Sequence, residues 1–392
     1  MRSVPATAAL FFFCLAVAVT PSIASGQSLT NRLSLLLTEQ RSAPVVADTQ
    51  AAAATSEAFE ELFSIELSNL PNPSSSAGVV YRLDPSLGIV ARASDSFGPF
   101  FTERAFRNTG GRFSAGVAIQ FARFSLLHGD DLTDGTFPIS ATRPTDVDPP
   151  FAVEKLTLQL ERQSVTVFAD YGIGERLSLG AVLPLTRVQL SGSRVRNQGG
   201  NAALQSLQAG SAMGVGDFVV NARVLVAGDG PRGASIGTDL RLPTGRSEDF
   251  LGAGRVGARV LGIGSWEQGP VGVYVNGGYS VGGLSRSLEW SGAATLAATA
   301  RVSVVGEILG RRFLEARVLE PIWQPHSSVR ILDTLVWRAS EHRFNATSLA
   351  AGARWNIADA WLLNANVLFS LASGGLRAPL TPAVSVDYDF GL

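Results

Sequence analysis

From residue 77 to the end of the chain, apolar and polar side chains alternate with a period of two, which is the pattern of half-buried β-strands. In the closing segment VSVDYDFGL (384–392), the even positions are apolar or aromatic and the odd positions are small or acidic. We identify twelve such segments, at 112–127, 154–171, 176–191, 214–227, 233–243, 254–264, 270–282, 286–297, 301–313, 344–357, 361–371 and 380–392. Each is about as long as a strand that crosses a bilayer at a tilt.

The connections between these segments alternate in length. Short turns are expected at 172–175, 227–233, 266–270, 298–300 and 358–360, and longer connections at 128–153, 192–213, 244–253 and 314–343. Short turns on one side and longer loops on the other are typical of outer-membrane barrels. The pattern predicts an all-β, antiparallel transmembrane β-barrel of about 12 strands, with the C-terminus on the periplasmic side. A hairpin at 77–93 would make the number 14 if it inserts.

Charged side chains fall on one parity of these segments and apolar ones on the other. An arginine that faces lipid near the bilayer midplane costs about 2–4 kcal/mol, so this sorting favours a lipid-facing apolar surface around a polar lumen. The candidates for lining the lumen and setting selectivity are Arg223, Arg241, Arg255, Arg259, Glu289, Glu307, Arg311, Arg354 and Asp387. The alternative is that these charges pair across strands and close the barrel. A soluble sheet with one wet face would also alternate.

The sorting changes phase in two segments. In 154–171 the apolar positions are even at Leu156, Leu158 and Leu160 but odd from Val165 onward, and in 176–191 the phase changes after Leu185. A β-bulge in each strand would produce such a change.

The region before residue 77 has a different pattern. Met1-Arg2 followed by an apolar core and small residues near Ser25 predicts a signal peptide over 1–26. Residues 28–40 and 51–71 predict helices, the second with Phe59, Leu62 and Phe63 on one face, and 71–76 reads as a linker. We expect the domains to be 1–26 signal peptide, 27–76 helical segment and 77–392 barrel, with the apolar helix face in contact with the barrel.

Composition narrows the function further. Charged residues make up 17% of the chain against about 25% in typical soluble domains, and the net charge of −1 offers no basic surface for nucleic acid. The single cysteine, Cys14, lies in the predicted signal peptide. The mature chain is therefore expected to have no disulfide, thiolate metal site or cysteine nucleophile.

Several short motifs match spacings that are typical of enzymes. Residues 252–257 match a dinucleotide-binding spacing, but the strand before it and the helix after it are missing from the pattern. Ser235 and Ser280 match the nucleophile-elbow spacing, yet all three histidines are expected in loops, so we predict neither an enzyme nor a cofactor. Five aspartates between 130 and 148 crowd one predicted external loop and are read as a solvated surface or as calcium ligands that bridge to lipopolysaccharide.

Several stretches also carry a family resemblance, among them YRLDPSLG (81–88), SFGPFFTERA (96–105), VFADYGIGERLSLGAVLPL (167–185), GVGDFVVNARV (214–224) and DLRLPTGRSEDFLGAG (239–254). Their ordered series resembles the outer-membrane protein family named for the meta-cleavage pathway of phenol degradation, over roughly 77–392. The resemblance implies an outer-membrane barrel that transports aromatic or other small organic solutes. Closing strands of such barrels usually end in an aromatic residue, whereas this chain ends in Leu392.

The functional hypothesis is an outer-membrane channel of a Gram-negative bacterium for facilitated diffusion of a small organic solute, aromatic in particular. The alternative is a closed structural or surface-binding barrel that acts through its external loops. The expected partners are outer-membrane lipid and lipopolysaccharide, the barrel-assembly machinery through the C-terminal strand, and the solute.

Overall fold

The computed structural model describes residues 27–41, 47–74, 81–84, 89–92, 95–105, 111–228, 232–358, 360–371 and 374–390. The predicted signal peptide and Leu392 lie outside these residues. Two helices come first, α2 (Leu29–Thr38) and α3 (Thr49–Ser68), followed by a separate hairpin of β1 (Tyr81–Asp84) and β2 (Ile89–Arg92). Among the described residues, no helix is both long enough and apolar enough to cross a membrane.

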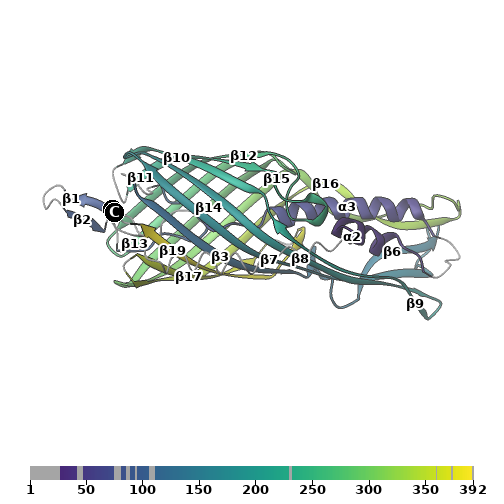
Figure 1. Ribbon diagram of the computed structural model, residues 1–392. Coiled ribbons are helices and arrows are strands. Elements are labelled where there is room, and N and C mark those ends of the chain that lie inside the picture. Colours follow the sequence, from purple (N-terminus) through teal and green to yellow (C-terminus); the bar gives the residue numbers. More distant parts are fainter. Residues whose placement is uncertain are drawn as a thin grey trace.

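A closed antiparallel barrel of twelve strands forms the body of the molecule (Figure 1). In chain order the strands are β3 (Phe113–Phe124), β7 (Ala152–Ile173), β8 (Leu177–Gln198), β10 (Phe218–Gly228), β11 (Arg232–Leu242), β12 (Gly257–Gln268), β13 (Val271–Gly282), β14 (Ser287–Thr299), β15 (Val302–Pro325), β16 (Leu332–Ala358), β17 (Trp361–Ser370) and β19 (Leu380–Phe390). Strand β19 pairs with β3 and closes the ring. The twelve predicted strands are confirmed. The β1–β2 hairpin forms its own sheet, so the expected alternative of 14 barrel strands is wrong.

Four strands extend well beyond the others on one side. The outer parts of β7, β8, β15 and β16, together with β6 (Phe137–Pro144) and β9 (Asn201–Val215), form an open sheet in the order β9-β8-β7-β6-β16-β15. We call this sheet the extension; it lies at the right of Figure 1. The smaller elements are β4 (Leu126–Leu127), β5 (Asp130–Asp131), β18 (Leu376–Arg377) and the 3-10 turn η1 (Ser247–Asp249).

Helices α2 and α3 lie in the concave side of the extension (Figure 1). Ser28 caps α2, with its hydroxyl accepting from the Asn31 amide, and the Asp48 carboxylate caps α3 in the same way through the Ala51 amide. One continuous apolar core joins the helices to the sheet: Leu29, Leu33, Leu36, Leu37, Phe59, Leu62, Phe63, Leu156, Leu158, Leu160, Val188, Leu190, Phe313, Trp337 and Phe344. The apolar helix face was predicted to contact the barrel; it packs on the extended ends of barrel strands, in the extension and not in the barrel proper.

The phase change predicted to mark bulges has a different cause. Strand β7 buries every even position from Ala152 to Gly172, and its register with β8 is unbroken from end to end, so the expected bulges are wrong in both strands. Inward positions are apolar in the extension because helices pack there. They are polar in the barrel, where Arg162, Ser164 and Thr166 follow Leu160. The phase change therefore reflects a change in what fills the interior, from apolar helix side chains to polar groups, whereas the facing of the strand's side chains stays the same.

The outer surface of the barrel is apolar. Side chains that the alternation places outside are exposed along successive strands, among them Val224, Ile236, Leu240, Val273, Val275, Leu288, Trp290, Leu349, Phe369 and Val384. Aromatic rings gather near the end that carries the short turns and the C-terminal strand, at Trp266, Trp355, Trp361, Tyr388 and Phe390, where the Tyr388 ring contacts those of Trp361 and Phe390. This is the girdle expected at a membrane interface.

The chain between α3 and β3 runs through the barrel. Gln120 on β3 donates to the carbonyl of Pro71 at 3.3 Å, and the Phe97 amide donates to Ser303 Oγ at 3.0 Å close to a short turn. The β1–β2 hairpin lies outside the same short-turn end (Figure 1). We call residues 69–74 and 95–105 together the lumen segment, because both stretches lie inside the barrel and meet where the Ser74 amide donates to the Phe100 carbonyl at 2.7 Å.

Candidate functional site

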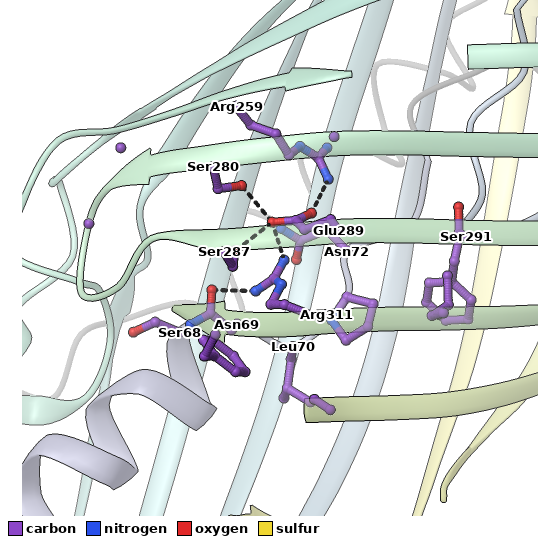
Figure 2. Close-up of a pocket in the computed structure, with 18 of the residues that line it drawn as sticks. Ser68, Asn69, Leu70, Asn72, Arg259, Ser280, Ser287, Glu289, Ser291 and Arg311 are labelled. Atoms are coloured by element: carbon purple, nitrogen blue, oxygen red, sulfur yellow. Dashed lines mark hydrogen bonds and ion pairs between the residues drawn. The ribbon is translucent and has the colours of Figure 1, made fainter. Parts of the chain in front are cut away.

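The barrel interior is charged, and the lumen segment occupies part of it. Between this segment and the wall remains a cavity of about 290 Å³, which we call the chamber (Figure 2). The chamber reaches from the β13–β14 turn at Gly282 to Asn221 and Asn276 deep on the wall, and Ser68, Asn69 and Leu70 line it from the side of α3. It is at the lower limit of the range usual for small-molecule sites, roughly 300–1,000 Å³.

Three arginines of the wall hold the C-terminal end of α3. Arg162 donates to the carbonyl of Leu67, Arg241 donates through Nη1 to the carbonyl of Ser68 at 3.0 Å, and Arg311 donates through Nη1 to Asn69 Oδ1 at 2.5 Å. The last carbonyls of a helix lack intrahelical partners and carry the negative end of its dipole. Inward-facing cations at this level therefore satisfy and orient the helix end.

Glu289 is the centre of the charged network beside the chamber. It accepts from Arg259 Nη1 at 3.2 Å, from Arg311 Nη2 at 3.0 Å and from Ser280 Oγ at 2.5 Å, as Figure 2 shows. Arg259 also donates through Nε to Asp239 at 2.6 Å on the neighbouring strand. These groups join five adjacent strands, β11 to β15, to the helix end, and their charges compensate one another within the network.

Glu307 holds the lower part of the lumen segment through its backbone. Its carboxylate accepts from the amides of Phe100 at 2.7 Å, Phe101 at 3.0 Å and Thr102 at 2.6 Å, and it is almost completely buried. Arg354 donates to the carbonyl of Pro99 directly before these residues. Three amide donors satisfy the hydrogen-bonding capacity of the buried carboxylate. The same bonds hold the backbone of the lumen segment against the wall.

Two further ion pairs join the lumen segment to the wall. Arg104 pairs with Glu267, which also accepts from the Tyr274 hydroxyl at 3.0 Å. Arg223 donates to Glu103 at 3.0 Å and to the carbonyl of Arg104 at 3.1 Å. Both pairs are buried, and in each pair removal of one partner would leave an uncompensated charge.

Of the nine candidates named from the sequence, eight project inward from barrel strands. Asp387 accepts from Asn364 Nδ2 at 2.9 Å and from Ser385 Oγ at 3.0 Å, which keeps it within the wall. Arg255 instead lies exposed in the loop before β12, because that strand begins at Gly257 and not at 254. Arg241, Arg259, Arg311 and Glu289 line the chamber, whereas Arg223, Glu307 and Arg354 hold the lumen segment.

Sequence reasoning missed the residues outside regular alternation. Glu103 and Arg104 belong to an irregular stretch, Glu66 to the helix and Arg377 to a two-residue strand. The one available signal was the adjacent opposite charges Glu103-Arg104 within SFGPFFTERA, a stretch otherwise rich in aromatic residues. Arg162 was hidden at the phase change of its segment.

Arg377 and Glu66 both line the chamber, but their side chains do not bond to each other. Among the described residues neither makes an ion pair within 4 Å, and the Nε of Arg377 is buried without a hydrogen-bond partner. Burial raises the pKa of Glu66 to about 8, against the pull of Arg311 and Arg377. A Cβ at Gly375, whose φ is +74°, would collide with the Glu66 carboxylate, so glycine permits this close approach.

The serines with nucleophile-elbow spacing bond to groups other than histidine. Ser235 Oγ donates to the carbonyl of Ala105 at 2.6 Å and Ser280 Oγ to Glu289 at 2.5 Å. Of the histidines expected in loops, His342 lies instead on the outer part of β16. In the aspartate-rich loop, Asp131 accepts from Thr133 and Asp134 accepts from Thr136, each two residues on. These are the local bonds of tight turns.

No protein-family model matches the chain, and no curated protein matches it by sequence, so no sequence match names the phenol pathway. Several solved outer-membrane barrels are similar in structure. An outer membrane channel from Pseudomonas putida F1 has 13% identity and a TM-score of 0.43, over 73% of this chain and 98% of its own. The NanC porin has 8% identity and a TM-score of 0.36, over 70% and 100%. The CymD monoaromatic hydrocarbon channel has 8% identity and a TM-score of 0.28, over 73% and 89%. The assignment of the fold rests on this chain's own strands.

Proposed function

We propose that the protein is an outer-membrane channel of a Gram-negative bacterium for facilitated diffusion of a small organic solute, and that the lumen segment gates it. The observation that carries the proposal is the chamber: a cavity lined by both charged and apolar side chains that reaches from an exposed turn into the interior of a closed barrel and is bounded by a chain segment. A barrel needs a hydrated path and no cofactor for such transport. Catalysis has no part in the proposal.

The exterior supports the membrane location. A closed ring satisfies every backbone group of the wall, and its apolar surface with an aromatic girdle suits hydrocarbon and interface. Short turns and the C-terminal strand belong on the periplasmic side in such barrels. The extension and both helices then lie outside the cell, where they would meet lipopolysaccharide. Assembly would use the C-terminal strand β19.

The gate is held by hydrogen bonds and ion pairs between the lumen segment and the wall. The apolar core of α2 and α3 lies in the extension, beyond the barrel proper. Release of the contacts at Glu307 and Arg104 would free residues 95–105 without unfolding that core. Movement of this stretch would connect the chamber with the short-turn end.

Flux measurements in liposomes test the proposal. The wild-type protein should pass small organic acids, and Glu307→Gln should raise the rate severalfold, because an amide accepts fewer backbone hydrogens than a carboxylate and carries no charge. Glu315→Gln is the matched control, because Glu315 lies on β15 like Glu307 but forms an exposed ion pair with Arg286. Absence of flux through the wild-type protein for a panel of aromatic acids, sugars and fatty acids would defeat the proposal.

The alternative of a closed, surface-binding barrel is favoured by one observation. The lumen segment meets the wall at several buried charged contacts, which seals much of the interior. In that case the extension would be the functional surface. Neither the wild type nor Glu307→Gln would then pass any solute of the panel.

A further inference from the structure

We infer that the chamber is a binding site for a small organic monocarboxylate, with Arg377 and Arg241 as the groups that receive the carboxylate. This inference deepens the proposed function and rests on it for its physiological meaning. The site itself stands on the geometry of the chamber, so it can be measured without any transport.

The charges around the chamber leave a positive excess. Among the described residues, four guanidinium groups line it, from Arg241, Arg259, Arg311 and Arg377, and four carboxyl groups, from Glu66, Glu103, Asp239 and Glu289. Glu103 is paired with Arg223, which is outside the lining, so at least one positive charge remains uncompensated even with Glu66 ionised. A singly charged anion matches this excess.

The unused hydrogen-bond donors belong to two of the four arginines. Arg259 and Arg311 are committed to Asp239 and Glu289. Arg241 forms no ion pair with a described residue, and it donates to the carbonyl of Ser68 through Nη1. Arg377 has a buried Nε without a partner. Guanidinium groups present paired donors in a plane, which is the geometry that a carboxylate accepts.

Apolar surface lies next to these donors. Phe101, Phe124, Phe313, Leu376 and Val219 line the same cavity. A ligand that fills it therefore needs an apolar body as well as an anionic end, within a volume of about 290 Å³. Inorganic phosphate carries no apolar body, and an extended lipid chain exceeds the volume.

Glu66 limits the affinity of the site. It faces the chamber near Arg311 and Arg377, and when ionised it repels an incoming carboxylate. At pH 9, above the pKa of Glu66, removal of its charge should therefore strengthen binding, whereas removal of the Arg377 charge should weaken binding. Opposite effects of two neighbouring substitutions are what a specific anion site requires and a merely structural role would not give.

Calorimetric titration of the full-length protein in detergent with benzoate, hexanoate, benzamide and inorganic phosphate tests the inference. Benzoate should bind at least tenfold more tightly than benzamide or phosphate, and hexanoate should also bind. At pH 9, where Glu66 is mostly ionised, Arg377→Gln should weaken benzoate binding about tenfold and Glu66→Gln should strengthen it severalfold. Arg255→Gln is the matched control and should change nothing, because Arg255 is exposed and outside the chamber.

Equal binding of benzoate and benzamide, or unchanged benzoate affinity in Arg377→Gln, would overturn the inference, as would phosphate binding as tight as that of benzoate. The outcomes separate it from the proposed function. Flux of other solutes without benzoate binding would leave the channel standing and remove the site. Benzoate binding without flux of any solute would leave the site and remove the channel.

Discussion

Strand β7 passes through two regions of the molecule that have opposite polarity. In the extension its inward side chains are Leu156, Leu158 and Leu160, whereas in the barrel they are Arg162, Ser164 and Thr166. The outward side chains change in the opposite sense, from Lys155 and Gln159 to Val165 and Val167. The extension thus follows the rule of a water-soluble sheet and the barrel that of a membrane wall.

This difference shows that what surrounds a strand, and what fills the interior beside it, decides its pattern. In the extension, water lies outside and two helices lie inside, so apolar groups face inward. In the barrel, hydrocarbon lies outside and a charged lumen inside, so apolar groups face outward. The level at which the pattern inverts, between Leu160 and Arg162, marks the outer boundary of the proposed membrane region.

The largest expected effect concerns which side of the membrane the extension occupies. Because Cys14 is the only cysteine and lies in the predicted signal peptide, single cysteines can be placed in an otherwise thiol-free mature chain. Gln27→Cys, next to α2, should react with a polymer-linked maleimide on intact cells. Labelling is read as a mass shift on a gel.

Two exposed positions calibrate this labelling. Asn201→Cys, at the tip of β9, should react as Gln27→Cys does, and Glu175→Cys, in a short turn, should react only after the cells are lysed. Reaction of Glu175→Cys but not of Gln27→Cys on intact cells would reverse the proposed orientation.

The next largest effect is expected from the core of the extension. The ring of Phe59 is fully buried against Phe63, Phe137 and Trp337, so Phe59→Ala should cost about 3–5 kcal/mol in the docking of α3. Hydrogen exchange of the α3 amides measures this loss. Exchange in the barrel strands should stay slow, since the ring contacts none of the lipid-facing surface.

Glu57→Ala on the exposed side of the same helix serves as control. Faster hydrogen exchange throughout the barrel strands in Phe59→Ala would show that the extension and the barrel unfold as one unit, contrary to the distinction drawn between them.

A smaller effect is expected from a charge on the outward surface of β16. Leu349 is 41% exposed and lies between Ile308 and Phe369 on the neighbouring strands, within the apolar outer surface of the barrel. Leu349→Arg should lower the free energy of unfolding in lipid by about 2–4 kcal/mol, because the guanidinium group would face hydrocarbon. Urea unfolding in lipid vesicles, followed by tryptophan fluorescence, measures this change.

The extension of the same strand gives the control position. His342 is exposed there and contacts Glu320, so His342→Arg keeps a cation beside the acid and should change stability by no more than about 0.5 kcal/mol. Similar losses from both substitutions would mean that the extension is also immersed in lipid.

The sequence was sufficient for the barrel but not for its contents. Alternation predicted all twelve strands, since lipid on one side and charge on the other leave a strong period-two signal in segments such as 270–282. The lumen segment left no such signal. Residues 95–105 take their conformation from Glu307, Glu267 and other groups that are distant along the chain, and no local pattern encodes such contacts.

The arginine candidates show the same limit. Parity correctly placed Arg241 and Arg311 inside, because the rule depends only on the strand. Whether they meet solute, each other or a helix end depends on what fills the lumen. The sequence left pore lining and pairing across strands as alternatives, and the structure adds a third partner, the carbonyl end of α3.

The passage of the N-terminal part through the ring constrains biogenesis. Residues 69–74 directly follow a packed helical pair, and the next described residues form the β1–β2 hairpin outside the opposite rim. A helix with its side chains is about 10–12 Å across, so drawing either folded end through a finished ring would require it to unravel first. The hydrogen bonds between β19 and β3 are therefore expected to form last, after the lumen segment has taken its place inside the barrel.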